Sequence, residues 1–244
     1  DLAFILANKE EVIMSPQAQS QDMNLLNDVD VPEGGVASNL ISLGADRIWK
    51  ELKITGKGIV VAAQDGGVSW EHPALKERYR GWDAKARTAK HEYNWHAAVH
   101  VDDVGCPEDE AACRVCGPDT AQPCDVGFHG THTLGTVLGA EKGKKIIGMA
   151  PEAQWMACRN MYRGRVFDPS TGLTRIDSVG TPQTYNECFE FFLAPYPKGS
   201  NPFKDGNPNY APHVVTNSWG CPAMEGCTDR RRGQEFGGTL KALK

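Results

Sequence analysis

The sequence predicts an α/β domain organised around a mostly parallel sheet. Three apolar runs of small and β-branched residues support this: Gly58–Gln64, Gln154–Cys158 and His213–Thr216. Runs of this kind are typical of strands buried on both faces of a parallel sheet. Segments with helical periodicity occur between and after them, at residues 71–78, 130–140, 182–193 and 235–244. Strands that alternate with helices favour the α/β class.

The elements at the start of this domain are clearly marked. Ile41 and Ile48 belong to an apolar pattern that suits a short helix ending before Gly56. The strand at 58–64 stops at Asp65, because two glycines follow it and such glycines mark a turn. We therefore expect the chain to turn sharply at the carboxyl end of this strand.

Composition excludes several functions. The 244 residues are enough for one large domain or two small ones, and their formal net charge is −5. That charge argues against nucleic acid or an anionic membrane as the main partner. No apolar run reaches the roughly 18 residues that span a bilayer. The first residues also lack the charged-then-apolar pattern of a signal peptide.

The chain divides into three parts. Residues 1–14 hold a short apolar stretch, and residues 15–38 are rich in Gln, Asn, Asp, Pro and Gly, which predicts a linker. The globular pattern runs through residues 39–244. The last helical segment reaches Lys244 with no Gly or Pro stop signal, so we expect the sequence to end inside an element and the domain to be incomplete there.

Asp65 is the first candidate functional residue. It directly follows a buried strand, and open α/β sheets place their ligand crevice at the carboxyl ends of strands. The alternative is an Asp-Gly turn in which the carboxylate only caps the next segment. This stretch by itself leaves the two interpretations about equal.

His129 is the second candidate. It precedes a helical segment with the sequence Gly-Thr-His-Thr-Leu-Gly-Thr-Val-Leu-Gly, whose small residues allow close packing against neighbours. At a helix N-terminus the dipole lowers the pKa of an imidazole, and a nearby carboxylate opposes that effect. A general base needs this balance. The alternative is a polar helix cap, and His132 is interpreted as a structural neighbour.

Three segments can be considered together: GIVVAAQDGGVSWEHPAL at 58–75, FHGTHTLGTVLG at 128–139 and VVTNSWG at 214–220. In order and approximate spacing they resemble the subtilisin-like serine peptidases, the subtilases, and especially their bacillopeptidase F-like branch. The resemblance covers residues 39–244. It implies a three-layer subtilisin-like fold and a secreted serine endopeptidase that acts on proteins or peptides and needs no cofactor for catalysis.

The resemblance also implies roles for individual residues. Asp65 is similar to the triad aspartate that orients the histidine, and His129 to the general base. Ser218, Trp219 and Gly220 resemble the stretch whose backbone pairs with the substrate chain. Residues 4–14 look like the last strand of a family propeptide, which would make the chain's own propeptide a partner and the chain a precursor segment.

The sequence departs from the family pattern at four points. No serine lies in a Gly-Thr-Ser-x-Ala context, so the nucleophile is expected beyond Lys244, and the family's oxyanion asparagine is missing too. Gly66 replaces the usual Thr or Ser after the aspartate. Ala74 stands where many members have a calcium-ligating aspartate, so no metal residue is assigned, although structural calcium stays possible. An alternative function is an inactive pseudoprotease or peptide-binding protein with the same fold.

The cysteines favour disulfides and an oxidising compartment, because they are even in number and lie in loop-like sequence. The eight candidates are Cys106, Cys113, Cys116, Cys124, Cys158, Cys188, Cys221 and Cys227. The first four could pair in three ways, or form a zinc knuckle. The next two suit a bridge between a strand and a helix, with buried free thiols as the alternative, and the last two could close a small ring.

A zinc-dependent hydrolase is a further alternative. It would use His129, His132 and the cysteine cluster, but His-x-x-His lacks the intervening Glu and the i,i+4 spacing of the common zinc hydrolase motif. The sequence therefore favours the serine peptidase interpretation.

Overall fold

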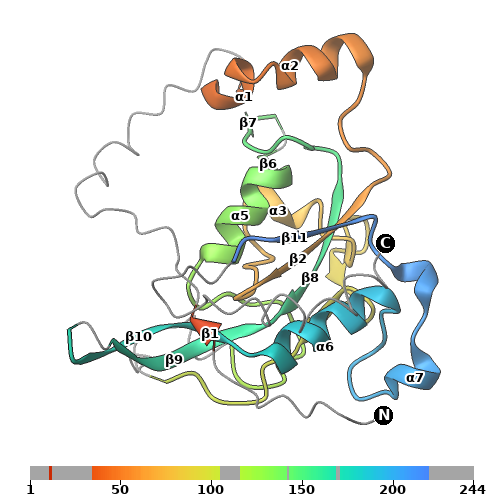
Figure 1. The fold of residues 1–244 in the computed structure, drawn as a ribbon. Coiled ribbons are helices and arrows are strands. Elements are labelled where there is room, and N and C mark those ends of the chain that lie inside the picture. Colours follow the sequence, from red (N-terminus) through yellow and green to blue (C-terminus); the bar gives the residue numbers. More distant parts are fainter. Residues whose placement is uncertain (1–10, 13–34, 105–115, 142, 169–170, 220–244) are drawn as a thin grey trace, which may run out of the picture.

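A computed structural model describes residues 11–12, 35–104, 116–141, 143–168 and 171–219 (Figure 1). The predicted helix at 235–244, Gly220 and four of the cysteines lie outside these residues. Those cysteines are Cys106, Cys113, Cys221 and Cys227.

The centre of the molecule is a parallel sheet of four strands in the order β11-β2-β8-β5. They are β11 (Val214–Asn217), β2 (Val60–Asp65), β8 (Gln154–Arg159) and β5 (Trp95–Ala97). The three predicted strands are confirmed, and so is the α/β class. The prediction that β11 is buried on both faces was wrong. Val214 is 51% exposed, because β11 lies at the sheet edge within the described part of the chain.

Alternate residues of β2 face two different layers of helices. Val61 and Ala63 pack in one cluster with Leu134 and Leu138 of α5 (His129–Leu138). Val60 and Ala62 pack in another with residues of α6 (Pro182–Leu193). The sheet therefore lies between two helical layers, as Figure 1 shows.

The helices agree with prediction in place more than in length. The predicted helix near residues 41–52 is broken into α1 (Ser38–Ser42), α2 (Ala45–Arg47) and a π-helical turn (Ile48–Leu52), with Gly44 at φ 75° between the first two. The helix predicted at 71–78 is the shorter α3 (Pro73–Lys76). Two further short helical segments are α7 (Pro202–Asp205) and a 3₁₀ turn (Pro208–Tyr210).

A long antiparallel hairpin extends from the sheet, and the sequence patterns did not predict it. Its strands are β9 (Met161–Asp168) and β10 (Leu173–Gly180). The outer edge of β10 carries β1 (Glu11–Val12), with Glu11 opposite Gly180 and Val12 opposite Val179. Two small antiparallel pairs complete the strands, β3 (Trp82–Asp83) with β4 (Thr88–Ala89) and β6 (Ala140–Glu141) with β7 (Lys145–Ile146).

Two disulfides lie within the described residues. Cys158 of β8 bonds to Cys188 of α6, as predicted, and joins the sheet to the second helical layer. Cys116 bonds to Cys124, a pair that the sequence had left open. None of the helices in the described part of the chain is long and apolar enough to cross a membrane.

Candidate active site

Asp65 ends β2 and lies almost fully inside the protein, with 3% of its surface exposed. Its Oδ1 accepts a hydrogen bond from the backbone N–H of Gly66 at 2.7 Å. Its Oδ2 accepts a longer one from the Thr133 hydroxyl at 3.4 Å. Gly66 supplies no hydroxyl, and the nearby hydroxyl is that of Thr133 in α5, which also lies 3.1 Å from the Gly130 carbonyl.

His129 is the first residue of α5, and the structure brings it against Asp65. Its Nδ1 lies 2.8 Å from Asp65 Oδ1 and 3.0 Å from Oδ2. Gly130 makes this approach possible, because a Cβ there would lie 2.0 Å from the Gly67 carbonyl oxygen and 2.9 Å from Asp65 Cβ. The glycine after the histidine is therefore a packing requirement of the pair.

The electrostatics of the pair suit a base. The hydrogen bond to Asp65 raises the pKa of His129 above its ordinary value, partial burial lowers it, and the negative charges of Asp65 and Asp125 raise it further. The net direction is upward, so the hydrogen bond and the negative charges outweigh the loss of solvent. With Nδ1–H donated to Asp65, the other ring nitrogen, Nε2, is the one that can take up a proton.

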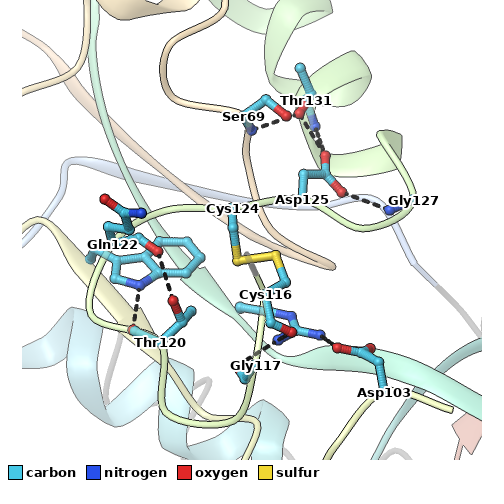
Figure 2. The surroundings of a disulfide bond; sticks show 12 residues. Ser69, Asp103, Cys116, Gly117, Thr120, Gln122, Cys124, Asp125, Gly127 and Thr131 are labelled. Atoms are coloured by element: carbon cyan, nitrogen blue, oxygen red, sulfur yellow. Dashed lines mark hydrogen bonds and ion pairs between the residues drawn. A yellow bond between two sulfur atoms is a disulfide. The ribbon is translucent and has the colours of Figure 1, made fainter. Parts of the chain in front are cut away.

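Sequence reasoning missed a second buried carboxylate beside this pair, Asp125. It lies four residues before His129 and is 4% exposed. Figure 2 shows its side chain between Thr131 and Gly127, next to the Cys116–Cys124 disulfide. The sequence Asp125-x-Gly127 was an available signal for a turn closed by the Asp side chain, but its burial was not visible in the sequence.

The pair borders a hollow between β2, α5 and the β9–β10 hairpin. The residues that line it include Asp65, His129, Asp125, Met161 and Ser178. The hairpin therefore reaches the candidate site, although its length carries it well beyond the sheet in Figure 1.

Ser218 and Trp219 directly follow β11. Because Asn217 pairs with Gln64 in parallel register, Ser218 leaves the sheet beside the end of β2 that carries Asp65. The Trp219 ring stacks on Tyr185 of α6, with ring centroids 4.3 Å apart. Both predicted substrate-side residues thus lie at the carboxyl edge of the sheet.

The cysteine cluster does not have the form that a zinc knuckle needs. Cys116 and Cys124 are joined to each other, with their Cα atoms 5.6 Å apart, so neither is a thiolate ligand. His129 directs Nδ1 to Asp65, and His132 is exposed on α5. Within the described ranges, no group of three or more His, Cys, Asp or Glu side chains is arranged to hold a metal ion.

Comparison with known proteins identifies the family of this chain. The subtilase family matches residues 56–236. Bacillopeptidase F of Bacillus subtilis (strain 168) is 35% identical over 188 residues, which cover 76% of this chain and 10% of that protein. The minor extracellular protease Vpr of the same organism is 31% identical over 172 residues, covering 67% and 18%. The intracellular serine protease of Paenibacillus polymyxa is 29% identical over 109 residues, covering 45% and 24%.

A solved structure, that of fervidolysin from Fervidobacterium pennivorans, a keratinolytic enzyme related to subtilisin, aligns with a TM-score of 0.43 and 18% identity. The alignment covers 96% of this chain and 28% of that one. The class defined by the parallel sheet and the matched segment is that of subtilisin-like serine proteases. The chain belongs to the subtilase family. It spans 10% and 18% of the first two relatives.

Proposed function

We propose that this chain is the first part of the catalytic domain of a secreted serine endopeptidase. The hydrogen bond between Asp65 and His129 carries the proposal, because it joins a buried carboxylate to an imidazole at the carboxyl edge of a parallel sheet. The third triad member is a serine supplied by polypeptide beyond Lys244. Family membership supports this assignment.

Each residue of the pair has one chemical task in the proposed reaction. His129 Nε2 takes the proton from the serine hydroxyl as the oxygen attacks the scissile carbonyl, and returns that proton to the leaving amine. Asp65 accepts Nδ1–H, which fixes the tautomer and stabilises the imidazolium. An asparagine side chain and the serine N–H, both outside this chain, stabilise the oxyanion.

The substrate chain is proposed to bind as an added strand. Ser218–Gly220 supplies one backbone edge, and the end of β10 supplies another. The support for β10 is that it already accepts a strand: β1 pairs with Val179 and Gly180, one residue from Ser178, which lines the hollow beside His129. Residues 1–14 then act as the end of the chain's own propeptide, and 15–38 as the linker in which maturation occurs.

The location is proposed to be extracellular. Two disulfides are favoured by an oxidising environment. One relative carries the word extracellular in its name, whereas another carries the word intracellular. The disulfides therefore carry this part of the proposal.

A second candidate function is peptide binding without catalysis. The observation that favours it is the same β1–β10 pairing, because an edge strand can hold a peptide without any nucleophile. The residues of the chain itself include no serine in the family's nucleophile context. The two functions differ only in whether the natural polypeptide supplies that serine.

The test starts from the natural polypeptide. Intact-mass measurement and peptide mapping past Lys244 establish whether a Gly-Thr-Ser peptide is present. A fluorophosphonate probe, which reacts with activated serines, then labels that peptide in the wild type and not in His129→Ala. His132→Ala is the matched control, since His132 is an exposed histidine on the same helix. Labelling that survives His129→Ala, or a native chain without the serine, contradicts the peptidase proposal; peptide binding would then be tested directly.

A further inference from the structure

The buried carboxylate of Asp125 accepts three hydrogen bonds from the turn that leads into α5. Oδ2 accepts the backbone N–H of Thr131 at 2.9 Å and the Thr131 hydroxyl at 2.6 Å. Oδ1 accepts the backbone N–H of Gly127 at 3.2 Å. The partners lie on both sides of His129 in the sequence, so this one side chain closes the turn that presents the imidazole (Figure 2).

The same carboxylate ties the turn to the segment that follows Asp65. The Thr131 hydroxyl accepts the backbone N–H of Ser69 at 2.9 Å, and it can therefore give its own proton to Asp125. The backbone N–H of Val68 donates to the Cys124 carbonyl at 2.8 Å, and Gly67 pairs with Asp125 as an isolated bridge. Asp125 thus connects the segment carrying the base to the segment carrying its carboxylate partner.

The turn itself has a constrained backbone. Phe128, directly before His129, has φ 56°, in the left-handed region that non-glycine residues rarely adopt. Such a conformation persists when surrounding interactions fix it. The hydrogen bonds of Asp125 to Gly127 and Thr131 span this residue and supply that constraint.

We propose that Asp125 is a positioning residue, whose ionised carboxylate holds the turn 125–131 so that His129 Nδ1 lies against Asp65. Its carboxylate hydrogen-bonds to Gly127 and Thr131, so it acts on the imidazole through the turn. The inference rests on the proposed function only for its catalytic consequence, because the positioning of the imidazole can be measured without activity.

The ionised form matters because all three partners are donors. A protonated carboxyl would lose one of these bonds, since its own hydrogen would face an N–H or O–H. Burial raises the pKa of Asp125 to about 6, against the lowering effect of the Thr131 and Gly127 hydrogen bonds, and the charge of Asp65 raises it further. The other charged or titratable side chains that line the hollow are His129, Asp103, Arg159, Tyr162 and Arg163.

The experiment follows His129 directly in the natural full-length protein. Diethyl pyrocarbonate acylates only the neutral imidazole, and peptide mass spectrometry measures how far His129 is modified as a function of pH. In Asp125→Asn we expect the midpoint to move to lower pH, because the Asp125 charge raises the pKa of His129. Asp83→Asn is the matched control: Asp83 also accepts two backbone N–H groups, at 2.9 and 3.0 Å, but it is exposed.

Two Thr131 variants keep the proposal testable if Asp125→Asn does not fold. Thr131→Val removes the hydrogen bond from the Thr131 hydroxyl but retains the carboxylate of Asp125. Asp125 then stays protonated to a higher pH, so we expect the His129 midpoint to fall, by less than in Asp125→Asn. Thr131→Ser keeps the hydroxyl and should match the wild type. A merely structural role would lower the melting temperature of Thr131→Val without moving the midpoint.

The catalytic readout is kcat/KM against pH. We expect Asp125→Asn to reduce its plateau about ten- to a hundredfold, the loss that follows when a reacting group is displaced by about 1 Å. Thr131→Val should move the acid limb to lower pH together with the His129 midpoint, because that limb reports protonation of the base. If the protein is inactive, the proposed function fails while the acylation result still decides the role of Asp125. An unchanged His129 midpoint in both Asp125→Asn and Thr131→Val overturns the proposal.

Discussion

In the part of the chain that the structure describes, histidines contact carboxylates at two places, and one of these has the arrangement of a base. On the α5 side of the sheet, His129 uses one ring nitrogen for Asp65. On the α6 side, His100 uses both: Nε2 lies 2.9 Å from Glu187 and Nδ1 lies 2.6 Å from Asp119. A hydrogen bond between imidazole and carboxylate is therefore not by itself a sign of catalysis.

Burial of the carboxylates separates the two places as well. Asp65 is 3% exposed, whereas the Asp119 side chain is 56% exposed and that of His100 is 42% exposed. His96 joins the second group through Glu187, at 2.7 Å. This partly buried network connects β5 and the segment after it to α6, so its expected role is to hold these elements together. The pair of Asp65 and His129 can instead move a proton between fixed partners.

The strongest test of this comparison is to replace one histidine at each place. In the full-length protein, His129→Ala should lower kcat by at least about 10⁴-fold, because the proton acceptor is lost. His100→Ala should leave kcat within about tenfold of the wild type, since both of its ring nitrogens already serve carboxylates. Steady-state kinetics on one peptide substrate measures both.

A large loss in His100→Ala with unchanged folding would show that the two places are coupled. Circular dichroism spectra of both variants provide the folding control. Equal activity in the wild type and His129→Ala would instead show that His129 is not the base, and the two places would then not differ in function.

The two disulfides of the described residues lie in different regions: Cys158–Cys188 joins β8 to α6, and Cys116–Cys124 lies beside Asp125. We expect the first to matter more for stability and the second more for activity. Opening Cys158–Cys188, with a separation of 30 residues, should cost about 3–4 kcal/mol in the free energy of unfolding under the chain-entropy model. Opening Cys116–Cys124, with a separation of 8, should cost about 2–3 kcal/mol. The second change should still affect activity more, because Cys124 directly precedes Asp125.

Double Cys→Ala variants of each bridge, measured by urea unfolding and by kcat/KM, test this reversal of order. Replacing both cysteines avoids a free thiol in either variant. If the two effects rank in the same order in both measurements, the Cys116–Cys124 bridge has no special connection to the site.

The sequence predicted those elements whose side chains have a regular pattern of burial. The strands β2 and β8 could be predicted because they are buried runs at the centre of the sheet, and α6 because its apolar residues recur at helical spacing. The β9–β10 hairpin could not, because much of it is exposed on both faces: Phe167 and Leu173 are more than half exposed. Its strands therefore lack the alternation that marks a half-buried strand.

The candidate site shows the same division. Asp65 and His129 could be predicted from local motifs, and the structure places them in contact across 64 residues of sequence. The partners that hold them could not. Thr133 reaches Asp65 from α5, and the importance of Asp125 depends on a burial that only the folded chain creates. Motifs identify candidate reacting groups, whereas the residues that support them come together only through packing between segments.

The smallest expected effect is a pH dependence of stability that belongs to His100. Burial lowers the pKa of His100, but hydrogen bonds to Glu187 and Asp119 outweigh it, so the folded pKa lies above the unfolded one. The stabilisation is then fully present below the unfolded value of about 6.5 and is lost as pH rises through the folded pKa. Burial raises the pKa of Glu187, but its hydrogen bonds and charge interactions with His96 and His100 outweigh burial, and the net shift is downward. The contribution of Glu187 to stability is therefore lost only as pH falls through its folded pKa.

Thermal melts of the wild type and His100→Gln between pH 5.5 and 8.5 isolate this effect. The difference in melting temperature should be largest near pH 5.5 and shrink as pH rises, because the variant has no charge to lose. His132→Gln serves as the control for loss of an exposed histidine. A difference that grows with pH would mean that His100 is neutral in the folded protein. The network of His96, His100, Glu187 and Asp119 would then be more similar to the His129 site than its hydrogen bonds indicate.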